Sequence, residues 1–230
     1  MEARKRIKRG VPVNFEGPSL ITLQRILVLG AHPDDIELSA GASVHKFASR
    51  ETKILGKIFS WCEDATPKGW SRRSIVDEFY SAMKVLGVRE VLDANFPNKQ
   101  LQSVRQEILD DLYGIRRDFD PDLVIVPSSY NSHQDHRVVY EEARRAFRGK
   151  SIFGYAMPHS DYGFTPDAIY CQVSDADVAA KVKAVMCYKS QFALRRPYFD
   201  LEYLKGAMRT AGGEVGLKNC EKFENVRAII

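Results

Sequence analysis

Two short polar segments of this chain carry residue types that bind metals. The first, HPDD at His32–Asp35, directly follows the apolar run RILVLG at 25–30. Its adjacent aspartates repel each other, and a nearby dication is the simplest way to keep both ionised. If a helix begins here, His32 and Asp35 converge on one metal and Asp34 points about 100° away. A plain helix N-cap explains one aspartate but leaves His32 unexplained.

The second segment, HQDH at 133–136, follows another apolar run, DLVIVP at 122–127. Two histidines and one aspartate, with a fourth position open for water, suit hydrolytic zinc. His32, Asp35 and His136 would form that set. The carboxyl edge of an open α/β sheet is also where such folds bind ligands. The two segments together therefore predict a site for one zinc ion per chain.

Elements that position these segments follow from the hydrophobic pattern. Apolar runs alternate with helical periodicity, which is typical of a mostly parallel sheet with helices on both faces. Strands are predicted at 25–30, 53–61, 88–93, 122–127, 152–155, 168–173 and near 225–230. Helices are predicted at 38–50, 74–86, 104–119, 138–147 and 175–188, and loops at 191–199 and 211–216. Neither GxGxxG nor a P-loop motif follows the first strand, so this turn does not read as a dinucleotide or P-loop phosphate site.

Composition bounds the class of protein. With 230 residues and 44% hydrophobic content, the chain can form one domain at 25–230 after a basic arm at 1–24. The net charge of +4 owes much to that arm, for which we expect a loosely ordered, solvated segment. A nucleic-acid tail is the alternative, but no aromatic stacking set accompanies it. The four cysteines lack CxxC spacing and are expected to be reduced. We expect a cytoplasmic protein without a membrane span or nucleic-acid partner, and leave a homo-oligomer open.

These motifs also carry a family resemblance. AHPDD, HQDH, CYKSQ at 187–191 and the C-terminal GEVGLKNCEKFENVR resemble the PIG-L/LmbE-like zinc-dependent deacetylases, over about Arg25–Ile230. The resemblance implies a Rossmann-like three-layer α/β sandwich. It also implies removal of acetyl from an N-acetylglucosamine-type amino sugar, which is free, nucleotide-linked or part of a glycoside.

The resemblance further implies roles for individual residues. His32, Asp35 and His136 become the metal ligands, and Asp34 becomes the general base. His133, oriented by Asp135, becomes the acid or oxyanion stabiliser. Amide hydrolysis needs these parts, because the carbonyl must be polarised, water activated and the leaving amine protonated. A His133 paired with Asp135 would be held partly as imidazolium.

Substrate contacts are less defined by the sequence. Arg73 is a candidate contact to a sugar hydroxyl or phosphate, although Arg72 competes for that role and a solvated helix start is equally compatible. Asn98 is a suspected loop contact. Arg196, with its neighbour Arg195, could hold an anionic group of the substrate. The alternative is that both side chains are exposed to solvent and bind nothing. His159 is expected to be a structural histidine.

Two other functions remain open from the sequence. A metallophosphoesterase also places His and Asp clusters at strand ends, but it usually needs ligands for a second metal. A non-catalytic metal- or sugar-binding protein would have no use for Asp34, a carboxylate beside the metal that is not needed as a ligand.

Overall fold

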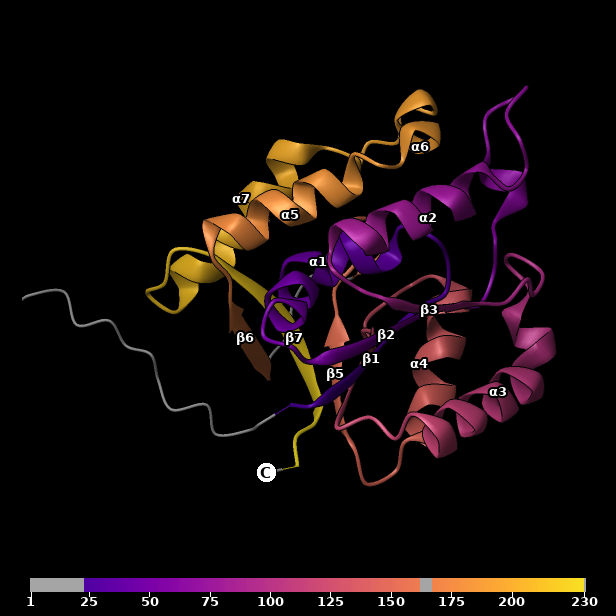
Figure 1. Cartoon of the computed structure of the whole chain (residues 1–230), viewed down its shortest axis with the longest axis horizontal. Helices are drawn as coiled ribbons and strands as arrows, with labels where there is room; N and C mark the ends of the chain where they lie inside the picture. The colour runs from indigo at the N-terminus through magenta and orange to yellow at the C-terminus, as the bar shows by residue number, and fades with distance from the viewer. Residues whose placement is uncertain (1–22, 162–166, 230) are drawn as a thin grey trace, which may run out of the picture.

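A single seven-stranded sheet forms the centre of the molecule (Figure 1). The computed structural model describes residues 23–161 and 167–229. The strand order is β3-β2-β1-β4-β5-β7-β6, and β7 runs antiparallel to both of its neighbours, β5 and β6, whereas the other pairings are parallel. The strands are β1 (Arg25–Gly30), β2 (Lys53–Ile58), β3 (Glu90–Asp93), β4 (Leu123–Pro127), β5 (Ser151–Tyr155), β6 (Ala168–Gln172) and β7 (Cys220–Arg227).

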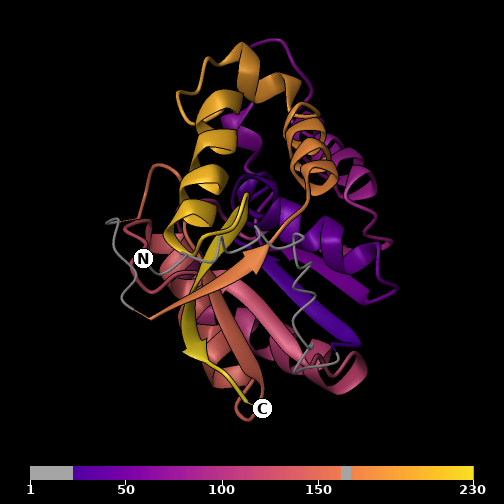
Figure 2. The same ribbon diagram turned by 90° about the vertical axis from the view of Figure 1, so that its left-hand side faces the viewer.

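Helices cover both faces of this sheet (Figures 1 and 2). One face carries α1 (Asp35–Ala48), α2 (Ser74–Val85), α5 (Asp175–Val185), α6 (Lys189–Ala193) and α7 (Leu201–Glu214). The other carries α3 (Arg105–Asp118) and α4 (Gln134–Ala146). Two short 3-10 turns, η1 (Glu63–Ala65) and η2 (Leu101–Val104), lie in the connections. The predicted three-layer α/β fold is therefore confirmed.

The core explains why β1 is apolar throughout. Ile26 and Val28 pack into the cluster beneath α1, α2 and α5, whereas Leu27 and Leu29 pack into the cluster beneath α3 and α4. Successive side chains of a strand point to opposite faces, so a strand covered on both sides must be apolar at every position. All four of these side chains are buried.

Strand order brings the two polar segments together. β1 pairs in parallel with β2 on one side and with β4 on the other. The connection from β1 leads to one face of the sheet and the connection from β4 to the other, which makes this a topological switch point. The segments 31–35 and 128–136 therefore leave the sheet side by side at its carboxyl edge.

Some element boundaries differ from the predictions. α1 begins at Asp35 rather than 38, and α4 at Gln134 rather than 138, because polar residues at the site form the first helical turns. α7 was not predicted, and it occupies most of the expected loop at 211–216. α6 fills the start of the expected loop at 191–199, and the last strand begins at Cys220 rather than near 225.

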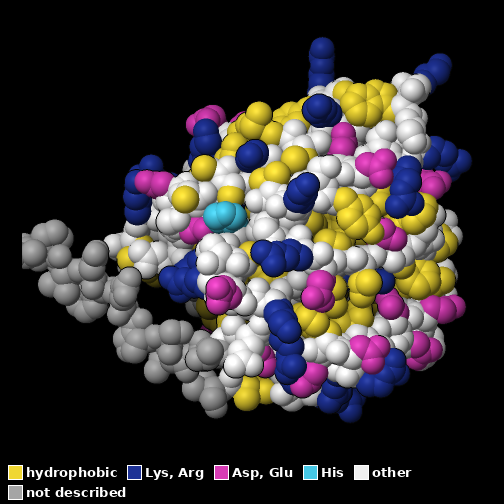
Figure 3. Space-filling view, viewed as in Figure 1, with side chains coloured by type: hydrophobic (Ala, Val, Ile, Leu, Met, Phe, Trp, Pro, Cys, Tyr) yellow, Lys and Arg dark blue, Asp and Glu magenta, His cyan; other side chains and the backbone are white. Residues whose placement is uncertain are grey.

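The surface mixes charges of both signs. Figure 3 shows acidic and basic side chains interspersed over the face drawn there. The basic arm falls almost wholly in residues 1–22, outside the described part of the chain. Among the described helices, none is both long enough and apolar enough to cross a membrane.

Candidate active site

The first polar segment makes a sharp turn between β1 and α1. Asp34 is the residue before the helix, and its backbone is left-handed, with φ 86° and ψ −24°. Asp35 begins the helix, and its Oδ2 accepts the backbone N–H of His32 at 2.9 Å. This hydrogen bond closes the turn and brings the His32 ring over the first turn of α1. Asp34 and Asp35 are both buried.

The second polar segment forms the start of α4. His133 caps the helix, because its Nδ1 accepts the backbone N–H of Asp135 at 3.2 Å. His136 lies in the first helical turn and is buried. Asn131 fixes the preceding loop: its Oδ1 accepts the His133 N–H at 2.9 Å, and its Nδ2 donates to Asp161 Oδ1 at 2.6 Å. Asn131 was not predicted, although it lies only two residues before the HQDH motif.

Three ligand atoms from the two segments converge. His136 Nε2 lies 3.2 Å from Asp35 Oδ2 and 3.3 Å from His32 Nδ1, and His32 Nδ1 lies 3.8 Å from Asp35 Oδ2. Ligands about 2.0–2.1 Å from a tetrahedral ion lie roughly 3.3 Å from one another, so these atoms fit around one metal. The residues present therefore suit a dication such as zinc.

A second grouping includes His133. One ring nitrogen from each of His32, His133 and His136 lies within 4.8 Å of the others. The Nδ1 of His133 already accepts a backbone hydrogen bond. In the neutral ring the proton then sits on Nε2, which leaves no lone pair for a metal. The ligand atoms of His32, Asp35 and His136 also lie closer together, at 3.2–3.8 Å, than the ring nitrogens of the three histidines. His133 is therefore assigned the part of a hydrogen-bond donor beside them.

Asp135 contacts a different histidine from the one expected. Its Oδ2 lies 3.0 Å from His32 Nε2, whereas its contact with His133 is through its own backbone N–H. The backbone N–H groups of Lys99 and Leu101 donate to the same carboxylate at 2.7 and 3.1 Å. The expectation that Asp135 orients His133 is therefore wrong: its carboxylate fixes the His32 ring with a proton on Nε2 and a free lone pair on Nδ1.

The expected imidazolium at His133 also does not fit. Burial, together with the nearby His32 and His136, lowers the pKa of His133 to about 4. The ring is therefore neutral at neutral pH, with Nε2–H available to donate. A neutral imidazole can still stabilise a developing oxyanion through this hydrogen bond.

The pKa values of the two adjacent aspartates are shifted in opposite directions. Burial, then the charges of Asp35 and Glu37, raise the pKa of Asp34 well above its ordinary value, and the charge of Arg196 opposes that rise. Burial also disfavours ionisation of Asp35, but the charge and hydrogen bond of His136 hold its pKa below the ordinary value. Asp35 is thus suited to remain an anion, and Asp34 to take up a proton.

Predicted substrate contacts lie around this edge without touching the cluster. Arg73 stacks on Trp61, with its guanidinium carbon 4.6 Å from the ring centroid, and Arg72 pairs with Glu63 at 3.0 Å. The suspected Asn98 donates to Asp64 Oδ1 at 2.6 Å. Arg73 directly precedes α2, in the connection that leaves β2, the strand that pairs with β1.

A further group borders the site from the C-terminal third of the chain. His159 stacks on Tyr198, with ring centroids 3.9 Å apart. Burial lowers the pKa of His159, and the charges of Asp35 and His136 also act on it, so this ring lies near the cluster. A structural role was the preferred expectation for this histidine, with a place near the site as the alternative, and no spacing signal in the sequence connected it to either motif.

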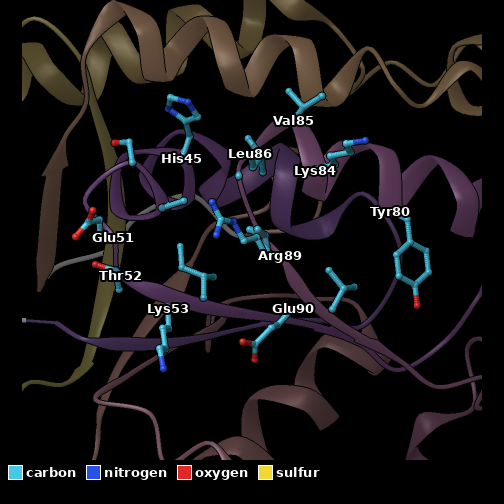
Figure 4. Close-up of a pocket in the computed structure, with 16 residues that line it drawn as sticks. His45, Glu51, Thr52, Lys53, Tyr80, Lys84, Val85, Leu86, Arg89 and Glu90 are labelled. Carbon is cyan, nitrogen blue, oxygen red and sulfur yellow. The ribbon is translucent and has the colours of Figure 1, made fainter.

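One pocket lies far from this chemistry. It has a volume of about 1070 Å³ and lies where α1 and α2 end and β2 and β3 begin (Figure 4). That is the amino edge of these strands, opposite the polar segments. None of the predicted site residues lines it.

Comparisons with known proteins agree with this geometry. The family model described as PIG-L, GlcNAc-PI de-N-acetylase, matches residues 27–147, which include both polar segments. The uncharacterised deacetylase YaiS of Escherichia coli (strain K12) is 29% identical over 171 residues, covering 72% of this chain and 90% of YaiS.

Two solved structures share the fold. The conserved protein TT1542 from Thermus thermophilus has a TM-score of 0.76 at 23% identity, covering 91% of this chain and 97% of that one. The N,N'-diacetylchitobiose deacetylase from Pyrococcus horikoshii has a TM-score of 0.70 at 19% identity, covering 88% and 83%. The family match and the two adjacent motifs lead to one conclusion: this chain belongs to the PIG-L family and is an amide-hydrolysing deacetylase.

Proposed function

We propose that this enzyme removes the acetyl group from an N-acetylglucosamine-type amino sugar, with one zinc ion held by His32, Asp35 and His136. The observation that carries the proposal is the convergence of His32 Nδ1, Asp35 Oδ2 and His136 Nε2, at separations of 3.2–3.8 Å. A zinc ion bound there would supply a Lewis acid to polarise the amide carbonyl and acidify a water.

The remaining residues have separate tasks in this proposal. Asp34 accepts the proton of the attacking water, because it adjoins a ligand, is buried and has a raised pKa. His133 donates its Nε2–H to the oxygen that gains negative charge. Asp135 keeps the His32 ring in the orientation and tautomer that a metal requires. Once protonated, Asp34 can return the proton to the departing amine.

An acetylated amino sugar is the substrate class that the relatives favour. The description of the family model names a GlcNAc-PI de-N-acetylase, and one protein of similar fold is an N,N'-diacetylchitobiose deacetylase. In the connection after β2, Trp61 supplies a flat apolar ring that is partly exposed, and Arg73 lies over it. An aromatic face with an adjacent donor suits a small sugar, and we keep Arg73 as the proposed contact to it.

The test is acetate release from a panel of N-acetylglucosamine, UDP-N-acetylglucosamine and N,N'-diacetylchitobiose, with and without EDTA. We expect acetate and free amine in equal amounts from at least one compound, abolished by EDTA and restored by zinc. A protein that binds two metal ions and releases phosphate from p-nitrophenyl phosphate, but no acetate, would instead be a metallophosphoesterase. Binding of a sugar without any turnover would indicate a non-catalytic protein.

A further inference from the structure

The backbone of Asp34 adopts a conformation that is uncommon for residues other than glycine. Its φ of 86° places it in the left-handed region, where the Cβ of an L-residue crowds the following carbonyl oxygen. This residue lies between two proposed ligands, His32 and Asp35. Its backbone conformation therefore sets the direction of its carboxylate relative to the neighbouring Asp35. A hydrogen bond from its backbone N–H helps to hold the residue there.

That contact comes from the far end of the chain. The backbone N–H of Asp34 donates to the hydroxyl of Tyr188 at 2.9 Å. Tyr188 precedes α6 and is fully buried. Its own hydroxyl proton goes to Glu37 Oε1, 2.7 Å away, and Glu37 is fully buried in α1.

The groups in this chain of hydrogen bonds determine which one donates and which one accepts. A backbone amide can only donate, so the tyrosine oxygen must accept from Asp34. The one hydroxyl proton is then free to point at Glu37, which anchors the hydroxyl and leaves its lone pairs facing Asp34. Tyr188 thus links the turn before α1 to the helix itself. None of the proposed metal ligands forms part of this pair of hydrogen bonds.

We propose that Tyr188 and Glu37 are positioning residues, which hold the Asp34 backbone so that its carboxylate lies beside the metal ligands without becoming one. The inference rests on the proposed role of Asp34 as general base. Without the tyrosine hydroxyl, the Asp34 N–H is buried without a partner, and the residue can relax toward negative φ. The carboxylate would then turn away from its working direction while the three ligands stay in place.

Tyr188→Phe tests this with the loss of a single oxygen atom. We expect kcat for acetate release from N-acetylglucosamine or N,N'-diacetylchitobiose to fall by about 10–100-fold, the usual range for outer hydrogen-bond partners. Zinc content and KM should stay within about twofold, because only the step that uses Asp34 is affected. Glu37→Gln retains an oxygen acceptor and should keep most of the activity, whereas Glu37→Leu should resemble Tyr188→Phe.

Tyr155→Phe is the matched control. Tyr155 is also fully buried, and its hydroxyl donates to the backbone carbonyl of Leu29 at 2.9 Å. Its loss should lower thermal stability to a similar degree but leave kcat within about threefold, because its hydroxyl contacts the backbone of β1 and not that of Asp34.

A double-mutant cycle distinguishes positioning from general damage. If Tyr188 acts through Asp34, Tyr188→Phe should cause no further loss of kcat in an Asp34→Asn background. Equal losses in both backgrounds, or an unchanged kcat in the single variant, would overturn the inference. Hydrogen exchange of the Asp34 amide, followed by NMR, gives a readout without substrate: it should accelerate in Tyr188→Phe but not in Tyr155→Phe.

The same cycle separates this inference from the proposed function. If Asp34→Asn alone keeps full activity, the proposed base is wrong, and the exchange rate still decides whether Tyr188 holds the turn. If Asp34→Asn is inactive while Tyr188→Phe has normal kcat and normal exchange, only the positioning role is wrong.

Discussion

His32 Nε2 and Asp135 Oδ2 lie 3.0 Å apart, so a carboxylate from the segment after β4 orients a histidine from the segment after β1. The side chain of Asp135 is fully buried, and the bond spans 103 positions of sequence. An ionised carboxylate can only accept, which places the proton on His32 Nε2 and the lone pair on Nδ1. The segments after β1 and β4 therefore both determine the orientation of His32, a proposed metal ligand.

Replacing this carboxylate should weaken metal binding. In Asp135→Asn, the affinity for zinc is expected to fall by about 10–100-fold, since the amide can present a donor where His32 needs an acceptor. Activity should recover partly in excess zinc. Competition with a chromogenic chelator measures the affinity.

Asp177→Asn is the control for that experiment. Asp177 pairs with His45 at 2.7 Å, well away from the polar segments, so its loss should leave zinc affinity unchanged. An Asp135→Asn protein with wild-type affinity would show that His32 does not depend on this carboxylate.

His133→Asn separates the cap of α4 from the proposed oxyanion contact. Asparagine is a good N-cap, so the melting temperature should change little, but its shorter side chain cannot deliver the donor. We expect kcat to fall by about 10²-fold, and His133→Ala to lose stability as well.

The pH profile of the same variant tests the charge of His133. Because burial lowers the pKa of this ring to about 4, it is neutral across the working range. The rate of His133→Asn should therefore be reduced by a similar factor at every pH between about 5 and 9. Selective loss of the alkaline limb would mean that an imidazolium is needed after all.

Glu37 should make stability depend on pH. Burial raises its pKa from 4.5 to about 8 in the folded state. The folded protein thus keeps a proton that the unfolded chain releases, and the stabilisation is complete below about pH 4.5 and lost as pH rises to about 8. The glutamine of Glu37→Gln cannot titrate, so the variant does not lose this stabilisation. As pH rises from about 4.5 to about 8, the melting temperature of the variant should therefore increase relative to that of the wild type.

Thermal denaturation of both proteins at several pH values measures this difference. A gain of about 3 °C or more between pH 5 and pH 8.5 would correspond to roughly 1 kcal/mol for a domain of this size. Parallel curves for the two proteins would show that Glu37 titrates normally.

Sequence was sufficient to predict that the two polar segments lie at the same edge of the sheet. HPDD and HQDH each follow an apolar strand, and the parallel arrangement of strands places both at one edge of the sheet. Ligand types and their spacing are local properties, so His32, Asp35 and His136 could be selected without a structure. The partner of Asp135 could not, because it depends on the orientation of two rings from different strands.

Contacts over long distances in sequence were also out of reach. Tyr188 meets Asp34 across 154 positions, and only the resemblance of CYKSQ to the family drew attention to it. α7 was missed because glycines interrupt its periodicity, and one of them is required by packing. A Cβ at Gly212 would lie 2.7 Å from the carbonyl oxygen of Leu217. A backbone approach of this kind leaves no pattern in the sequence.

The most direct test of the proposed mechanism compares Asp34→Asn with Asp35→Asn for bound zinc and for acetate release. Asp34→Asn should retain one zinc ion per chain and a normal KM, while kcat falls by about 10²–10⁴-fold for the loss of a general base. Asp35→Asn should lose zinc first and regain part of its activity when zinc is added in excess. If Asp34→Asn loses the metal and Asp35→Asn keeps it, the two roles are reversed; if both keep full activity, the proposed mechanism is wrong.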